Sequence, residues 1–287
     1  MRRILTTTAF LMCAGLGVAS AQTAKIVAAE NFYGDVASQI GGQYATVTSI
    51  LTNPDQDPHL FEANPSTARQ IADARLVIFN GADYDPWMVK LLSASKGTGR
   101  MVIEAAKLVG RKAGDNPHIW YDPPTMPAVA KAVAESLAKA DAAHRNFFAE
   151  RADAFTASLK PMNDKIAALR ARFNGASVTA TEPVFGYMAE ALGLTMRNRP
   201  FQVAIMNDTE PSAAQIAAFE NDLKTRAVKV LLYNNQASGA LTEKMQVSAK
   251  ASGIPIVGVS ETSPPGKTYQ DWMLAQLNEL ERALADP

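Results

Sequence analysis

Two of the three histidines in this 287-residue chain stand in matching settings. His59 lies in the segment NPDQDPHLFEANPS, and His118 lies in GDNPHIWYDPP. Each follows a proline, which fixes its own φ and biases the residue before it toward extended backbone, so each imidazole leaves a stiff loop in a defined direction. Two rigidly presented imidazoles are what a metal site requires. Chance could also place two histidines after prolines, so the pair needs further donors before it predicts a site.

Two glutamates supply those donors. Glu182 follows an expected strand at 177–180, and Glu261 follows another at 254–259. In open α/β sheets, ligands bind beyond the carboxyl ends of the strands. Two neutral nitrogens from the first half of the chain and two anions from the second half would leave a divalent ion almost neutral, which lowers the cost of burying it.

The elements that would position these side chains alternate between strand and helix. The patterns predict strands at 25–30, 46–51, 76–80, 101–105, 177–180, 228–233 and 254–259, and helices at 34–40, 65–73, 87–92, 126–141, 185–192, 242–251 and 269–284. A capping-box pattern, Ser212 with Gln215, predicts one more helix start. The fold class is therefore α/β, with two lobes of mostly parallel sheet.

One segment differs from this alternation. An apolar stripe spaced three and four residues apart runs from Phe148 to Phe173 and predicts a helix over 144–174. Thirty residues of helix would span about 45 Å, long enough to run across both lobes. Pro161 should kink it, at a cost of roughly 3 kcal/mol if nothing compensates. A coiled-coil partner helix is the alternative.

The N-terminus predicts export. Arg2 and Arg3 precede an apolar stretch over 4–18 and an A-x-A cleavage site at 19–21, so we expect a signal peptide at 1–21 and a periplasmic protein. We expect an N-terminal lobe at 22–143, the linker helix at 144–174 and a C-terminal lobe at 175–287. Without residues 1–21 the chain has no cysteine and 26 basic against 28 acidic residues, because two of the 28 basic residues are removed. That balance argues against a nucleic-acid partner.

Four motifs carry a resemblance to a known family. They are DPHLFEANPSTARQIADARLVIFNGADYDPWM, NPHIWYDPPTMPAVAKAVAESLAKAD, TEPVFGYMAEALGL and GIPIVGVSET, in this order. The chain resembles the periplasmic metal-binding proteins of zinc and manganese ABC importers, the cluster A-I (cluster 9) solute-binding proteins. The resemblance implies a helical-backbone metal receptor that passes one divalent ion to an integral-membrane permease with its ATPase.

The resemblance also implies four metal ligands, at His59, His118, Glu182 and Glu261. The third ligand is histidine in zinc-type members and glutamate in several manganese-type members. The fourth is usually aspartate, so Glu261 departs by one methylene, and it could bind directly or through water. Carboxylate oxygens suit manganese or iron, whereas zinc favours four close donors and binds more tightly at a common site. The expected ion is manganese or zinc, with iron as the third option.

Other conspicuous residues have ordinary structural interpretations. We expect Glu62 to bond loop backbone or orient His59, and His144 to lie on the surface. The remaining members of this set are expected in turns or in the core: Asp57, Asp122, Trp87, Trp120, Met162 and Met188.

Two other functions compete with metal capture. A zinc hydrolase would use His59 and Glu62, spaced as H-x-x-E, together with His118 as its metal ligands. Such an enzyme also needs an open coordination position for water and a separate general base. A binding protein for an organic solute would present aromatic faces, yet aromatics are 7% of the chain. An adhesin role could coexist with metal binding. We therefore expect a monomeric carrier of one metal ion, with no enzymatic activity and no organic ligand.

Overall fold

The computed structural model describes residues 23–285 except 56, 57, 59, 60, 96, 98 and 238. Its first sheet has four parallel strands in the order β2-β1-β3-β4. The strands are β1 (Ala24–Glu30), β2 (Ala45–Leu51), β3 (Leu76–Phe79) and β4 (Met101–Glu104). All four residues of β3 are buried, as expected for a strand with helices on both faces.

The second sheet repeats this plan with the order β6-β5-β7-β8, again all parallel. Its strands are β5 (Ser177–Ala180), β6 (Thr195–Arg197), β7 (Leu231–Asn234) and β8 (Ile256–Val259). The edge strand β6 was not predicted, because three residues with partly exposed side chains carry no apolar signal. The predicted α/β class with two parallel sheets is confirmed.

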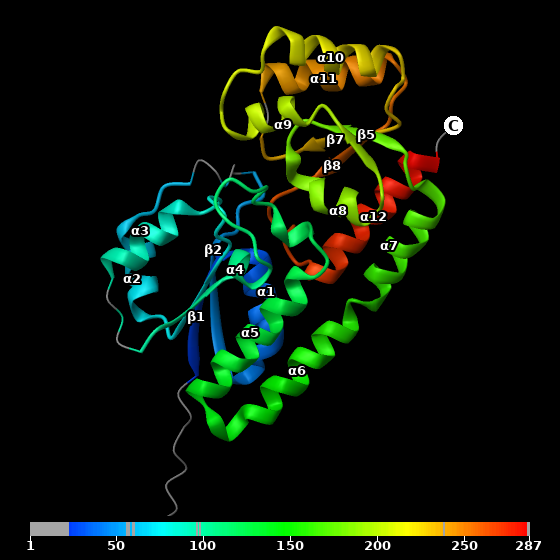
Figure 1. Cartoon of the computed structure of the whole chain (residues 1–287). Coiled ribbons are helices and arrows are strands. Elements are labelled where there is room, and N and C mark those ends of the chain that lie inside the picture. Colours follow the sequence, from blue (N-terminus) through cyan, green and yellow to red (C-terminus); the bar gives the residue numbers. More distant parts are fainter. Residues whose placement is uncertain are drawn as a thin grey trace, which may run out of the picture.

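Helices pack around each sheet (Figure 1). Those of the first half are α1 (Asn31–Gly41), α2 (Pro65–Asp73), α3 (Pro86–Ala94), α4 (Ala105–Leu108) and α5 (Thr125–Ala140). Those of the second half are α8 (Gly186–Ala191), α9 (Arg199–Met206), α10 (Ala213–Lys224), α11 (Ala240–Ala251) and α12 (Tyr269–Ala285). Single 3₁₀ turns lie at Gly42–Tyr44, Ile119–Tyr121, Ala142–His144 and Pro183–Phe185. The predicted capping box is present, since Ser212 accepts from the Gln215 N–H and Gln215 accepts from the Ser212 N–H.

The long connecting segment runs along one side of the molecule from the first lobe to the second (Figure 1). It consists of α6 (Arg145–Ser158) and α7 (Lys160–Phe173), separated by Leu159. Pro161 lies in the first turn of α7, where its missing N–H costs little, and the break falls just before it. The predicted helix is therefore present, interrupted at Leu159, two residues before the position where Pro161 predicts a kink.

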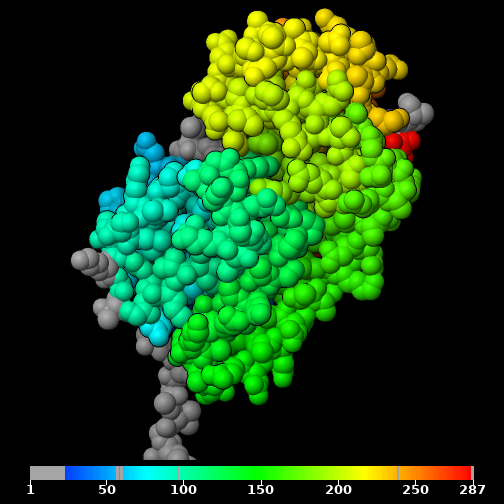
Figure 2. Space-filling view, in the orientation of Figure 1, coloured from blue at the N-terminus to red at the C-terminus, as the bar shows by residue number. Residues whose placement is uncertain are grey.

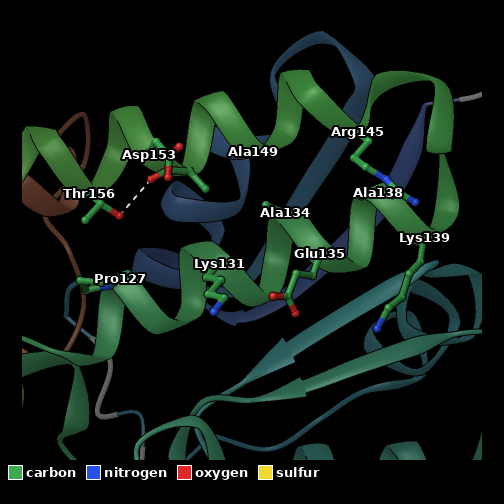
Figure 3. A pocket seen from close by; sticks show the side chains of 11 residues that line it. Pro127, Lys131, Ala134, Glu135, Ala138, Lys139, Arg145, Ala149, Asp153 and Thr156 are labelled. Atoms are coloured by element: carbon green, nitrogen blue, oxygen red, sulfur yellow. Dashed lines mark hydrogen bonds between the residues drawn. The ribbon is translucent and has the colours of Figure 1, made fainter.

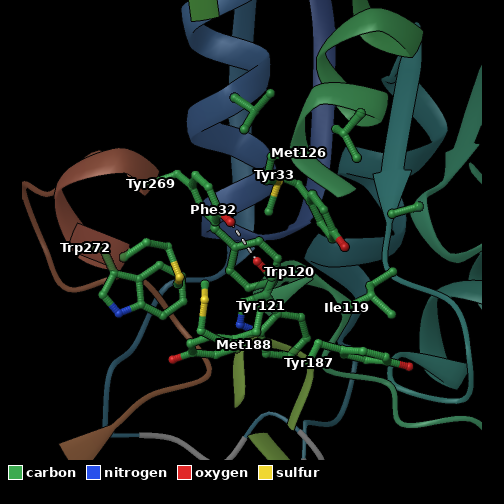
Figure 4. Close-up of a cluster of buried hydrophobic side chains, with 14 of the residues drawn as sticks. Phe32, Tyr33, Ile119, Trp120, Tyr121, Met126, Tyr187, Met188, Tyr269 and Trp272 are labelled. Carbon is green, nitrogen blue, oxygen red and sulfur yellow. Dashed lines mark hydrogen bonds between the residues drawn. The ribbon is translucent and has the colours of Figure 1, made fainter. Parts of the chain in front are cut away.

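A single buried cluster joins the two lobes (Figure 4). Phe32 of α1 stacks on Trp120 at 4.7 Å between ring centroids, and Trp272 of α12 lies 5.9 Å from Phe32. Trp120 is fully buried, and its backbone oxygen accepts from the Tyr269 hydroxyl at 2.8 Å. The core therefore crosses the lobe boundary, which ties the lobes together more firmly than a flexible hinge would.

The two lobes are also in contact at the surface. Around residues 110–120 the first lobe lies directly against the yellow-green surface of the second lobe (Figure 2). Asn31 and Ser263 exchange two hydrogen bonds across the boundary, at 2.7 and 2.9 Å. Within the described part of the chain, no helix has the length and apolarity needed to span a membrane.

Candidate metal centre

The loops at the carboxyl ends of the second sheet bring two of the predicted ligands together. Glu182 follows β5 by two residues, Glu261 follows β8 by two residues, and Asn234 ends β7, which lies between them. All three side chains are buried. Parallel neighbouring strands end at the same edge of a sheet, so these three polar groups converge.

His118 reaches this edge from the first lobe. Its Nδ1 lies 2.7 Å from Asn116 Oδ1, which also accepts from the His118 backbone N–H at 3.2 Å. An amide oxygen can only accept, so Nδ1 carries a proton and donates it to Asn116 Oδ1. Nε2 lies 3.4 Å from Glu261 Oε2. The hydrogen bond of its Nδ1 thus holds the imidazole in one orientation, as partners of metal-ligating histidines commonly do.

Asn116 also fastens the His118 loop to the Glu182 loop. Its Nδ2 donates to the Pro183 oxygen at 2.8 Å, and its own backbone oxygen accepts from the Tyr187 hydroxyl at 2.8 Å. Proline at positions 117 and 183 restricts both loops. One side chain therefore orients the ring of His118 and fixes its position relative to the second lobe.

Tyr84 and Asn234, among the described residues, donate to the Glu261 carboxylate. Tyr84 donates its hydroxyl to Oε2 at 2.9 Å, and Asn234 Nδ2 donates to Oε1 at 2.7 Å. The same Nδ2 donates to Oε2 of Glu182. Burial raises the pKa of Tyr84 far above its usual range, and the charge of Glu261 raises it further, so this hydroxyl stays a donor at physiological pH.

Of the four predicted ligands, the structure places His118 beside Glu261 and joins Glu261 to Glu182 through Asn234. His59 lies outside the described residues. Within those residues, no three His, Cys, Asp or Glu side chains form a group that could hold an ion by themselves. The chemistry of the donors still suits a transition-metal cargo, because a buried imidazole lies beside the carboxylate of Glu261, which Asn234 joins to the carboxylate of Glu182. The full ligand set stays a prediction.

Most of the described residues that were given structural interpretations lie as expected or nearly so, whereas Glu62 is exposed and its bond to loop backbone or to His59 stays a prediction. Trp120, Met162 and Met188 are in the core, and Asp122 pairs with Arg111 at 3.2 Å. His144 is half-buried, because its ring stacks on Tyr44 and bonds Asp141. Asp57 lies outside the described residues.

The sequence argument missed the neutral partners of the site. It searched for ligand types at strand ends, and therefore passed over Asn116, Tyr84 and Asn234. The strand expected at 228–233 in fact ends at Asn234. A search for amides at the same strand ends would have found Asn234, whereas nothing local marks Tyr84 as a partner of a residue 177 positions away.

A large cavity lies elsewhere. It has a volume of about 710 Å³ and lies between α5 and α6 (Figure 3), with Lys131 and Glu135 on one wall and Arg145 and Asp153 on the other. Its floor is formed by alanines and it contains no histidine. A smaller hollow of about 230 Å³ between the lobes is lined by Asn116, Pro117 and Pro183, next in the chain to two predicted ligands.

Comparisons with known proteins find related metal-binding proteins. The chain is 22% identical over 291 residues to the manganese ABC transporter substrate-binding lipoprotein PsaA of Streptococcus mitis, covering 93% of this chain and 91% of that protein. It is 24% identical over 266 residues to the zinc-binding protein AdcA of Streptococcus pyogenes serotype M3, covering 81% of this chain but 50% of that protein.

The fold matches solved structures. The periplasmic zinc-binding protein TroA from Treponema pallidum superposes with a TM-score of 0.78 at 20% identity, covering 92% of this chain and 99% of that one. The family described as zinc-uptake complex component A, periplasmic, matches residues 26–283. This chain therefore belongs to the ZnuA family of periplasmic zinc-uptake components.

Proposed function

We propose that this protein is a periplasmic solute-binding protein that captures one divalent transition-metal ion and delivers it to an ABC importer. The observation that carries the proposal is the 3.4 Å approach of His118 Nε2 to Glu261 Oε2 across the lobe boundary. The ion would replace the direct contact between these two atoms. His59 and His118 would supply nitrogen, and Glu182 and Glu261 oxygen.

Burial and charge support an ion over a larger solute. His118 and Glu261 are fully buried, and Glu182 is 3% exposed. A cavity for an organic solute would need several hundred cubic ångströms, whereas these side chains are already within bonding distance of each other or of Asn234. Manganese and zinc are the ions named for related proteins. Iron is the third candidate.

The family supports a carrier without enzymatic activity. No separate general base accompanies the donors among the described residues of the site, and we propose that all four ligands are used by the ion. Capture in the periplasm implies an integral-membrane permease with its ATPase as the partner, and we propose that the protein acts as a monomer. We further propose a signal peptide at 1–21, lobes at 22–143 and 175–287, and a linker at 144–174.

The shared core of the lobes bears on ion release. Hydrogen bonds cross the boundary from Asn31, Asn116 and Tyr84, and α12 packs against both α1 and α7. We propose that release comes from small tilts and local loop motion. Crystals of free and loaded protein that differ by a wide lobe rotation would contradict this.

Isothermal titration of metal-free protein with Mn²⁺ and Zn²⁺ tests the function. We expect one ion per chain for the wild type, no measurable binding for His118→Ala combined with Glu261→Ala, and unchanged binding for the matched control His144→Ala. Equal binding by the double variant would place the ion elsewhere.

A further inference from the structure

Glu261 lies in a segment, 260–263, that belongs to neither a helix nor a strand. The segment connects β8 to α12, and three of its four residues, Glu261, Thr262 and Ser263, are buried. Buried backbone N–H and C=O groups outside regular structure need partners from side chains or water, because an unpaired group is costly. The position of Glu261 therefore depends on the side chains that bond to this segment.

Gln236 bonds to the middle of the segment. Its side-chain oxygen accepts from the backbone N–H of Glu261 at 2.6 Å and from that of Thr262 at 2.9 Å, and the Thr262 hydroxyl donates to it at 3.3 Å. These bonds fix the orientation of the side-chain amide, because reversal would turn its NH₂ toward two N–H donors. Gln236 is 7% exposed, so solvent has little access to these bonds.

The strand order explains how Gln236 reaches this segment. Gln236 follows β7, and β7 lies beside β8, whose carboxyl end leads into the segment. Asn234 Oδ1 accepts from the Gln236 backbone N–H at 3.0 Å, in a turn that asparagine side chains commonly form. Asn234 also donates to Glu261 Oε1 at 2.7 Å. Residues 234–236 thus bond to Glu261 at both its backbone and its carboxylate.

The first lobe holds the two ends of the segment. Tyr121 donates its hydroxyl to the Ser260 backbone oxygen at 2.8 Å, and Asn31 exchanges two hydrogen bonds with the Ser263 backbone. These contacts do not involve Gln236. Loss of the Gln236 bonds would therefore leave the ends in place and release the part of the segment that carries Glu261.

We infer that Gln236 is a positioning residue of the metal site, which fixes the backbone of Glu261 and through it the direction of the carboxylate. The inference rests on the proposed function, in which Glu261 is a ligand. Partners that orient metal ligands commonly lower metal affinity by about 10–100-fold when they are removed. Gln236 acts on the backbone of the ligand rather than on its carboxylate, so its effect should depend on the side chain at position 261.

The test is a double-mutant cycle on metal affinity. Gln236→Met keeps a side chain of similar length and removes the acceptor oxygen, and Gln70→Met, at an exposed position, is the matched control. Each substitution is made in the wild type and in Glu261→Gln, which keeps an oxygen at this position so that a weakened affinity can still be measured. Gln236→Asn withdraws the oxygen by one methylene and gives the same comparison if methionine does not fit.

Two quantities are measured. Competition titration gives the affinities for Zn²⁺ and Mn²⁺, and nuclear magnetic resonance gives the hydrogen exchange of individual backbone N–H groups in the metal-free protein. We expect Gln236→Met to lower both affinities by about 10–100-fold in the wild type, and by less than about threefold in Glu261→Gln, because the residue acts through Glu261.

The exchange measurement separates local release from general destabilisation. We expect exchange at residues 261 and 262 to become faster by about tenfold or more in Gln236→Met, while exchange in β5 stays unchanged. Gln70→Met should match its parent in both measurements.

Three results overturn the inference while leaving the function intact. Equal losses of affinity in both backgrounds would show that Gln236 does not act through Glu261. Unchanged affinity would show that the N–H bonds do not position a ligand, and unchanged exchange at residues 261 and 262 would show that Gln236 does not hold the segment. Wild-type protein that binds neither ion would remove the proposed function, and this inference with it.

Discussion

The buried pair Glu30 and Asp85 permits a quantitative prediction about pH. Glu30, the last residue of β1, is fully buried, and both of its carboxyl oxygens lack a hydrogen-bond donor among the described residues. Asp85 accepts from the backbone N–H groups of Asn80 and Gly81 at 2.7 and 2.8 Å. A buried carboxylate without donors is costly, so Glu30 keeps its proton and bonds Asp85.

The direction of the pH effect follows from the pKa values. Burial raises the pKa of Glu30 well above its usual range, and the charge of Asp85 raises it further. Burial also raises the pKa of Asp85 to about 6, against the opposing backbone hydrogen bonds. Acids whose pKa is raised on folding favour the folded state at low pH, and that advantage is lost as the pH rises toward the folded-state values.

We predict that Glu30→Gln makes the free energy of unfolding fall less steeply as the pH rises. In the wild type, the unfolded chain ionises Glu30 while the folded chain holds its proton, which lowers the free energy of unfolding by about 1.4 kcal/mol per pH unit. Glutamine has nothing to titrate, and its amide still donates to Asp85, so the variant gains relative to the wild type as the pH rises.

The assay is urea unfolding of metal-free protein, followed by tryptophan fluorescence from pH 4.5 to 7.5. Subtracting the wild-type curve from the variant curve cancels the titrating groups that are not coupled to Glu30, and the difference then reports Glu30 together with Asp85. Glu279→Gln, at an exposed position, is the matched control, and its free energy of unfolding should change with pH as that of the wild type does. A constant difference between Glu30→Gln and the wild type over the whole range would refute the reasoning.

The remaining predictions concern the metal and the core. Metal should raise the melting temperature by binding the folded state, and His59→Ala combined with His118→Ala should abolish that rise; an unchanged rise in a calorimetric scan would exclude histidine ligation. Affinity should fall as pH drops through about 6.5, because imidazole must be neutral to bind, and a flat titration from pH 5 to 8 would count against it. Asn116→Ala should weaken binding by about 10–100-fold by releasing the His118 ring, with titration calorimetry as the measure. Trp120→Ala should lower the free energy of unfolding by about 3–5 kcal/mol in urea titrations. A loss under about 1 kcal/mol would show that the Trp120 side chain is not important for the stability of the core.

The sequence alone was enough for the elements with strong local signals. The helix predicted at 65–73 matches α2, because Asn64 caps it and Pro65 opens it. The strand predicted at 177–180 matches β5, and Pro161 marked the kink in the linker. These features depend on backbone geometry and apolar spacing within a few residues, which the printed sequence contains.

The partners of the site were decided by tertiary structure. The sequence predicted ligand-type side chains after four strand ends. The strand order β6-β5-β7-β8, which the sequence did not predict, places Asn234 between Glu182 and Glu261. Tyr84 meets Glu261 across 177 positions, and Glu30 finds Asp85 because β1 and β3 are neighbours in the sheet. Hydrogen bonds and buried charge act over a few ångströms in space, so a pairing between distant residues exists only once the sheets have formed and the lobes have met.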